Sequence, residues 1–88
     1  MMNKESFIIT KNDGKKVTCN IIATYHNNDI NKDYIAYTDN TIDENGKLRV
    51  YYSLYEEVNN MIKLVNMENL EEKKIGLEFI KTVLSKLQ

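Results

Sequence analysis

The stretch YIAYTDNTIDENGKLRVYYSLYE, residues 34–56, contains two tyrosine-rich runs separated by a polar, acidic segment. The first run, YIAYT, is β-branched and aromatic, as strands usually are. The second, residues 47–55, alternates, which would place four apolar residues on one strand face: Leu48, Val50, Tyr52 and Leu54. The other face would carry Arg49, Tyr51, Ser53 and Tyr55. The stretch therefore predicts two sequential strands, residues 34–39 and 47–55.

The acidic segment between these strands, DNTIDENG, partly matches a calcium-binding loop. An EF-hand loop needs a carboxylate at its first position, a glycine at its sixth and a bidentate glutamate at its twelfth. If Gly46 is the sixth residue, the first is Thr41 and the twelfth is Tyr52. Neither Thr41 nor Tyr52 has the carboxylate that its position requires, so the segment is interpreted as a turn and not as a metal site.

Three more strands are predicted outside this stretch, at residues 6–11, 16–25 and 61–65. Asp13 and Gly14 form one of the strongest short hairpin signals, because glycine tolerates positive φ. Asn59 and Asn60 are suited to a second tight turn. In residues 16–25 the alternation would place five residues on one face, with Ile22 as the exception: Val17, Cys19, Ile21, Ala23 and Tyr25.

The C-terminal segment changes to a helical period and predicts a helix over residues 69–87. Its apolar stripe comprises Leu77, Ile80, Leu84 and Leu87, widened by Phe79 and Val83. Asn69 followed three residues later by Glu72 resembles a capping box. Gly76 is unfavourable inside a helix, so it marks either a break or a close approach to the sheet.

These elements predict one α+β domain over residues 1–88. Sequential strands with short turns favour an antiparallel β-meander of four to five strands, with the single C-terminal helix packed on one face. Which face the helix covers is left open, and so is whether residues 61–65 form a strand.

Composition and charge exclude several classes of function. Twelve Lys and Arg against thirteen Asp and Glu give a net charge of −1, without the cationic excess that nucleic-acid binding usually requires. No apolar run approaches the roughly 20 residues of a membrane span. The N-terminal segment lacks the pattern of a signal peptide. Cys19 is the only cysteine, which suits a reducing compartment, so a cytoplasmic protein is expected.

Residues that could carry catalysis or bind a metal are sparse. Zinc sites usually draw three or four ligands from histidine and cysteine, and this chain offers only His26 and Cys19. None of the three serines has the flanking glycines of a nucleophile elbow, and three glycines cannot build a phosphate-binding loop. We therefore expect no catalytic residues, no cofactor and no metal, and a protein that is not an enzyme.

Five of the six tyrosines fall within residues 34–56, and they suggest an interaction surface. Most of them fit a structural role as strand residues. Arg49, Tyr51 and Tyr55 would lie on the sheet face away from the helix, and Tyr and Arg are enriched in binding hot spots. The resulting hypothesis is a protein-interaction or regulatory module with an unknown partner, a second copy of the chain being one candidate. The alternative is a nucleic-acid-associated accessory protein that uses the tyrosine-rich face.

The order of these patterns resembles the DUF1292 family (UPF0473, YrzB-like) of small bacterial proteins. The similarity extends over nearly the whole chain and rests on turn and strand positions: Phe7, Asp13, Gly14, Tyr34, Tyr37, Thr38, Asp39, Asp43, Gly46, Leu48, Val50, Tyr51, Ser53 and Tyr55. The chain is less acidic than that pattern, and its helix lacks the tryptophan that often follows an acidic pair there. The resemblance implies a single cytosolic domain. It implies no activity, because the family's function is unknown.

Overall fold

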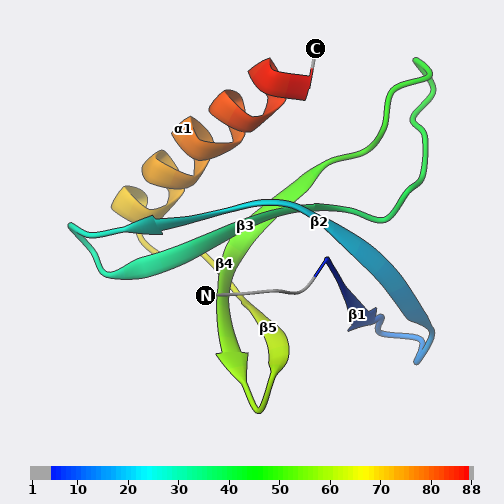
Figure 1. Cartoon of the computed structure of the whole chain (residues 1–88), viewed down its shortest axis with the longest axis horizontal. Helices are drawn as coiled ribbons and strands as arrows, with labels where there is room; N and C mark the ends of the chain where they lie inside the picture. The colour runs from blue at the N-terminus through cyan, green and yellow to red at the C-terminus, as the bar shows by residue number, and fades with distance from the viewer. Residues whose placement is uncertain (1–4, 88) are drawn as a thin grey trace.

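The computed structural model describes residues 5–87. It contains five strands followed by one helix: β1 (Ser6–Thr10), β2 (Lys16–Asn27), β3 (Lys32–Thr38), β4 (Tyr51–Val58), β5 (Met61–Val65) and α1 (Leu70–Leu87). All neighbouring strands pair antiparallel in the order β1-β2-β3-β4-β5, which is a meander. The predicted α+β class is confirmed, residues 61–65 do form a strand, and α1 packs across one side of the sheet (Figure 1).

Residues that tolerate positive φ form the tight turns of the meander. Gly14 has φ 85° in the β1–β2 turn, where its N–H donates to the Lys11 carbonyl at 2.9 Å. Asn59 and Asn60, with φ 53° and 65°, connect β4 and β5. These two turns lie where the sequence predicts them.

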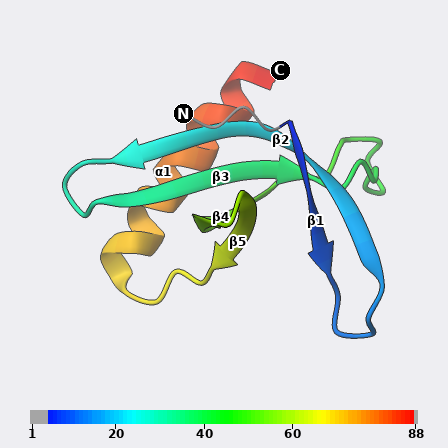
Figure 2. The same ribbon diagram turned by 60° about the horizontal axis from the view of Figure 1, so that its bottom comes forward.

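The sheet is strongly curled, so the β1–β2 hairpin turns over one of its faces (Figure 2). This concave face encloses a core of Phe7, Cys19 and Ile35, against which partly buried side chains from all five strands pack: Ile9, Val17, Ile21, Tyr37, Tyr55, Ile62 and Leu64. Residues of β1 and β5, the first and last strands of the sheet, thus contact one core. The concave face is buried without a helix.

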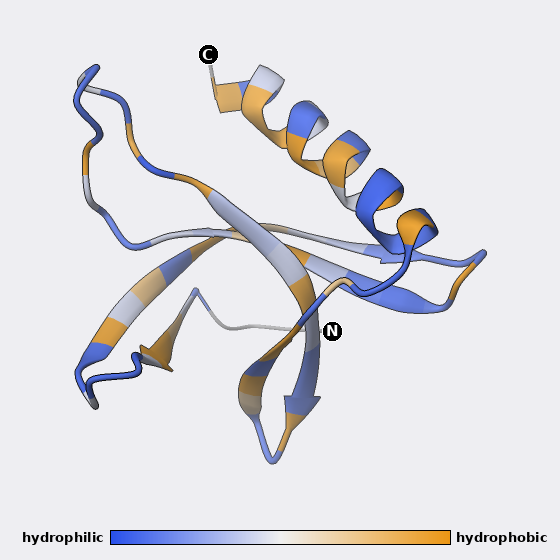
Figure 3. Cartoon of the chain, turned by 180° about the vertical axis from the view of Figure 1, so that it is seen from behind, coloured by the Kyte–Doolittle hydropathy of each residue, from blue (hydrophilic) through white to orange (hydrophobic). Residues whose placement is uncertain are grey.

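Helix α1 covers the opposite face, and Figure 3 shows its apolar side turned toward the sheet. Ile80 and Val83 pack there against Ala36, with five partly buried neighbours: Ile22, Ala23, Val50, Tyr52 and Phe79. Three successive residues of β3, Tyr34, Ile35 and Ala36, are all 0% exposed; Ile35 belongs to the concave core and Ala36 to the helix-side core. The sequence does not decide which face the helix covers; in the structure it is the face that carries Tyr34, Ala36 and Tyr52.

The predicted capping box fixes the start of α1. Asn69 Oδ1 accepts a hydrogen bond from the Glu72 N–H at 2.8 Å, and Glu72 Oε1 accepts from the Asn69 and Glu68 N–H groups at 3.2 and 2.8 Å. The helix begins at Leu70, so Asn69 is its N-cap and not its first residue. Gly76 does not break the helix. A Cβ there would lie 3.2 Å from ring atoms of both Tyr34 and Tyr52, so the glycine marks a close approach to the sheet.

The predicted strand at residues 47–55 is wrong at its start, because β4 begins at Tyr51. Residues 39–50 form an excursion from the sheet: the Arg49 N–H donates to the Thr41 carbonyl at 3.0 Å, and Leu48 makes only an isolated bridge to Ile42. The turn at Gly46, with φ 79°, pairs the two arms of this loop with each other. Residues 47–50 consequently do not continue the pairing with β3. The end of this predicted strand is also early, since β4 ends at Val58, and the boundaries of the other predicted elements differ by at most two residues.

The prediction that alternate residues of 16–25 share one face of the sheet is also wrong beyond Ile21. The register between β2 and β3 shifts between Ile21 and Ala23, which leaves Ile22 as an extra residue. Ile21 therefore packs in the concave core, while Ala23 packs against the helix-side core. Beyond this bulge the side chains of Ala23 and Tyr25 point to the helix side of the sheet.

Candidate functional site

Two members of the predicted interaction patch, Arg49 and Tyr51, lie at the base of the excursion formed by residues 39–50. The Tyr51 hydroxyl donates to Asp39 Oδ2 at 3.1 Å, and Arg49 Nη1 donates to Thr41 Oγ1 at 3.1 Å. The Thr41 hydroxyl, which donates to Asp39 Oδ1 at 2.6 Å, is the main cause of a lowered pKa at Asp39. The side chains of Arg49 and Tyr51 thus anchor the 39–50 loop.

The third member, Tyr55, lies elsewhere on the same face. It is partly buried against the concave core, and burial raises the pKa of its hydroxyl. Its neighbour across the β4–β5 ladder is Leu64, whereas Tyr51 stacks on Tyr37 with ring centroids 5.6 Å apart. The structure keeps both tyrosines on the face away from α1, as predicted, but brings only Arg49 and Tyr51 together at the loop.

The residues considered for catalysis occupy separate environments. His26 Nδ1 lies 2.8 Å from Asp33 Oδ1 on the exposed β2–β3 hairpin. Cys19 is 1% exposed in the concave core, and burial raises the pKa of its thiol. Over residues 5–87, no three His, Cys, Asp or Glu side chains are placed to hold a metal ion.

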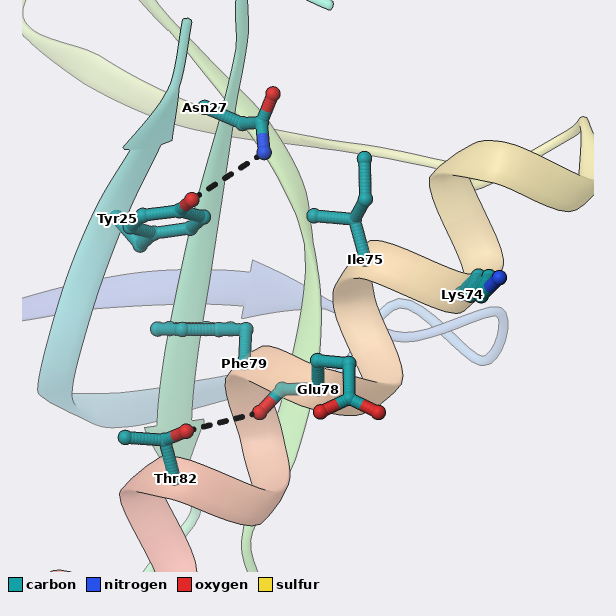
Figure 4. A pocket seen from close by; sticks show the side chains of 7 residues that line it. All are labelled: Tyr25, Asn27, Lys74, Ile75, Glu78, Phe79 and Thr82. Atoms are coloured by element: carbon teal, nitrogen blue, oxygen red, sulfur yellow. Dashed lines mark hydrogen bonds between the residues drawn. The ribbon is translucent and has the colours of Figure 1, made fainter. Parts of the chain in front are cut away.

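A groove separates the second half of β2 from α1, and two aromatic rings form its floor. Tyr25 and Phe79 stack with centroids 5.8 Å apart and an interplanar angle of 18° (Figure 4). Asn27 Nδ2 donates to the Tyr25 hydroxyl at 3.2 Å, which fixes the orientation of the ring. Tyr25 remains 43% exposed, so its ring is accessible from the groove.

We call this feature the β2–α1 groove. Its first part, about 450 Å³, is lined by Tyr25 and Asn27 from the strand and by helix residues that include Ile75, Glu78, Phe79 and Thr82. Its second part, about 330 Å³, continues along the same elements past Ile22, Ala23, Val83, Lys86 and Leu87. Both parts include Tyr25, Phe79 and Thr82, so they form one continuous surface.

The strand beside this groove has an open edge. The first residue of β1, Ser6, pairs with Asn20, and before it the Glu5 carbonyl accepts from the Ile21 N–H at 2.8 Å. Within the described residues 5–87, the rest of β2, residues 22–27, pairs only with β3. Every second residue of such an edge directs its N–H and C=O away from the sheet. We call residues 22–27 the open edge.

The sequence did not single out Tyr25 or Phe79 as site residues. In the sequence, Tyr25 is one more residue of an alternating strand, and Phe79 lies at the margin of a helical stripe. Phe79 lies at the border of the apolar stripe of α1, a position from which a side chain can contact a groove beside the sheet. That position is the available signal, but the groove itself depends on where the helix crosses the sheet.

Comparisons with protein-family models, with curated proteins and with solved structures found no match for this chain. In the described residues, no helix combines the length and the apolar character needed to cross a membrane. The resemblance to DUF1292 stays a prediction.

Proposed function

We propose that this protein is a non-enzymatic interaction module that binds an extended segment of a protein chain along the open edge of β2. One observation carries the proposal: residues 22–27 pair with β3 on one side and with no described residue on the other. An added strand gains affinity from main-chain hydrogen bonds to such an edge, and specificity from pockets that accept alternate side chains.

The β2–α1 groove supplies the second requirement, a surface for side chains. Side chains on one face of an added strand would point toward the helix, because successive residues of a strand point to opposite faces. There they would meet the exposed ring of Tyr25 and the stacked Phe79. Aromatic floors of this kind favour apolar or aromatic partner residues. Lys86 and Glu78 line the groove and provide charges at its helix side.

The cytoplasm is the proposed location, supported by the single, buried, unpaired cysteine. Arg49, Tyr51 and Tyr55 remain a second candidate surface. It has less support, because hydrogen bonds within the loop already engage Arg49 and Tyr51 and because Tyr55 is partly buried. The nucleic-acid alternative gains no support either, since Tyr34 is fully buried and Tyr37 packs in the concave core.

The test uses a library of random 12-residue peptides displayed on phage, selected against the full chain. We expect a selected peptide, titrated into isotopically labelled protein, to shift the backbone amide resonances of residues 22–27 and those of α1 beside Phe79. Tyr25→Ala removes the exposed ring and should weaken binding of that peptide about tenfold or more.

A matched control is Tyr51→Ala, which removes a similarly exposed ring at the other candidate surface. This variant should bind the selected peptide as the wild type does. The proposal is wrong if no peptide is enriched, or if the shifted resonances cluster around Arg49 and Tyr51 while Tyr25→Ala binds normally.

A further inference from the structure

The open edge lacks the devices that usually keep an edge strand from pairing. Monomeric proteins protect such edges with charged side chains, proline or very short strands. Residues 22–27 read IATYHN and contain no Lys, Arg, Asp, Glu or Pro. By contrast, β5 is five residues long and carries Lys63, and β1 is five residues long and flanked by Glu5 and Lys11. The unprotected edge is therefore the one suited to a strand partner.

The side chains of the open edge complement themselves when the strand is paired antiparallel with its own copy. A two-fold axis beside Thr24 would place Thr24 opposite Thr24 of the second copy, and threonine pairs across strands are favourable. The same register sets the large Tyr25 opposite the small Ala23, and Ile22 opposite His26. Tyr25 and Ala23 both lie on the helix side of β2, so a small side chain meets each aromatic ring.

The charges of α1 obey the same symmetry. Thr24 and Thr82 line the same part of the β2–α1 groove, and the two-fold axis is placed beside both. Glu78 lies four residues before Thr82 and Lys86 four residues after it. Rotation by two-fold symmetry reverses the helix direction and brings Glu78 of one copy toward Lys86 of the other. Two complementary charge pairs result, one on each side of the axis.

We propose that the partner bound at the open edge is a second copy of this chain, paired antiparallel through residues 22–27 about a two-fold axis at Thr24. The proposal rests on the proposed function and names its partner. Pairing of this kind joins two five-stranded sheets into one and places both α1 helices on the same side. It also closes the assembly, because each copy uses its own open edge and a two-fold interface repeats the same patch on both subunits.

Sedimentation equilibrium on the full chain, from about 5 µM to about 500 µM, tests the dimer. An interface of this limited size is expected to be weak, so the monomer and the dimer should both be populated within that range. Thr24→Lys puts two like charges face to face at the axis and should leave the protein monomeric throughout. Thr18→Lys is the matched control. It makes the same substitution at an exposed residue of β2 that is paired with β1, so this variant should dimerise as the wild type does.

A charge exchange then separates this register from any other. Lys86→Glu alone should raise the dissociation constant about fivefold or more, because it faces Glu78 of the second copy. Glu78→Lys combined with Lys86→Glu restores opposite charges across the axis and should restore dimerisation. The two positions are eight residues apart on one helix, beyond the spacing at which helix residues pair, so a rescue must arise between chains. The effect should fade as salt is added.

Three outcomes would overturn the second-copy proposal. A protein that stays monomeric over the whole range, yet binds a selected peptide at residues 22–27, would keep the proposed function and replace the partner. A protein that dimerises only after residues 1–4 are deleted would show that its own N-terminal segment competes for the edge. A dimer insensitive both to Thr24→Lys and to Lys86→Glu would use another surface.

Discussion

The two faces of the sheet are buried by different means. The concave face is closed by the sheet itself, since β1 and β5 bring Phe7 and Ile62 to one core around Ile35. The other face is closed by α1, whose Ile80 and Val83 pack on Ala36. Strand β3 contributes side chains to both cores, because successive residues of a strand point to opposite faces of the sheet.

The two cores also differ in how they are specified. The buried centre of the concave core is apolar, and its members need only a suitable size. The helix side adds hydrogen bonds with defined partners: the fully buried Tyr34 donates from its hydroxyl to the Glu72 carbonyl at 2.8 Å, and Glu72 also caps the helix. The concave core is thus specified by apolar packing, while the polar contacts on the helix side fix where the helix lies. That position in turn defines the β2–α1 groove.

Ile35→Ala should have the largest effect, because it empties the centre of the concave core. Ile35 is 0% exposed, and truncation of a buried isoleucine costs about 2–5 kcal/mol. For a domain of this size, that is a large part of the total stability. The measurement is the free energy of unfolding from urea titration, followed by circular dichroism.

Ile8→Ala is the matched control, since it makes the same truncation at a β1 residue that is 59% exposed. It should change stability by less than about 0.5 kcal/mol. Equal losses for the two variants would mean that the concave face is not a core of its own, and the comparison of the two faces would fail.

Gly76→Ala should come next and acts on the helix side. The added Cβ would lie 2.7 Å from Met67 Sδ and 3.2 Å from ring atoms of Tyr34 and Tyr52. The methionine can move, but Tyr34 is buried and hydrogen bonded, so the ring has little room to yield. Overpacking of about 1–3 kcal/mol should exceed the gain of up to 1 kcal/mol in helix propensity.

The control for Gly76→Ala is the double variant with Met67→Ala, which removes the nearest contact. It should recover only the part of the loss due to the sulfur and leave the contacts with the two rings. An increase in melting temperature for Gly76→Ala alone would show that the helix does not sit against these rings.

Local signals predicted the parts of this fold that depend on a few neighbouring residues. The Asp13-Gly14 and Asn59-Asn60 turns and the Asn69–Glu72 cap are of this kind, since φ preference and side-chain capping act over two to four residues. The bulge at Ile22 was visible only as a break in alternation, and one inserted residue exchanges the faces of everything beyond it. The open edge was not predictable, because it depends on β1 beginning at Ser6, opposite Asn20.

The candidate site shows the same division between local and tertiary information. Tyrosine enrichment pointed to residues 34–56, yet most of those rings hold the two cores together. Tyr25, outside that stretch, meets Phe79 only because α1 crosses the sheet at this place. Composition located the aromatic residues, and tertiary packing decides which of them stays accessible.

Tyr34→Phe should have a smaller effect, since it removes one buried hydrogen bond and keeps the ring. The lost bond runs from the Tyr34 hydroxyl to the Glu72 carbonyl, and such a deletion costs about 1 kcal/mol. The same substitution at Tyr25, whose hydroxyl accepts from Asn27 at the groove, should cost less because that residue is 43% exposed. Equal losses in urea titration would argue against Tyr34 as the polar anchor of α1.

The smallest effect is expected from Glu72→Gln, and it concerns pH. The N–H groups of Glu68 and Asn69 that donate to the Glu72 carboxylate hold its pKa below the ordinary value of 4.5. In the unfolded chain these bonds are absent, so between the two pKa values the unfolded state binds more protons than the folded state. The carboxylate thus contributes stability that is complete above pH 4.5 and is lost as the pH falls through the folded-state pKa. Glutamine keeps an acceptor oxygen but cannot titrate, so the variant should lose less stability than the wild type on acidification.

The measurement is the urea midpoint between about pH 6 and pH 3, with Glu71→Gln as the control because that neighbour is exposed and outside the capping box. The control should follow the wild-type curve. In every variant the urea midpoint should still fall somewhat as the pH is lowered, since hydrogen bonds also lower the pKa of Asp39 and Asp43 in the 39–50 loop. If Glu72→Gln follows the wild-type curve over the whole range, the acid sensitivity belongs to that loop and not to the helix side of the sheet.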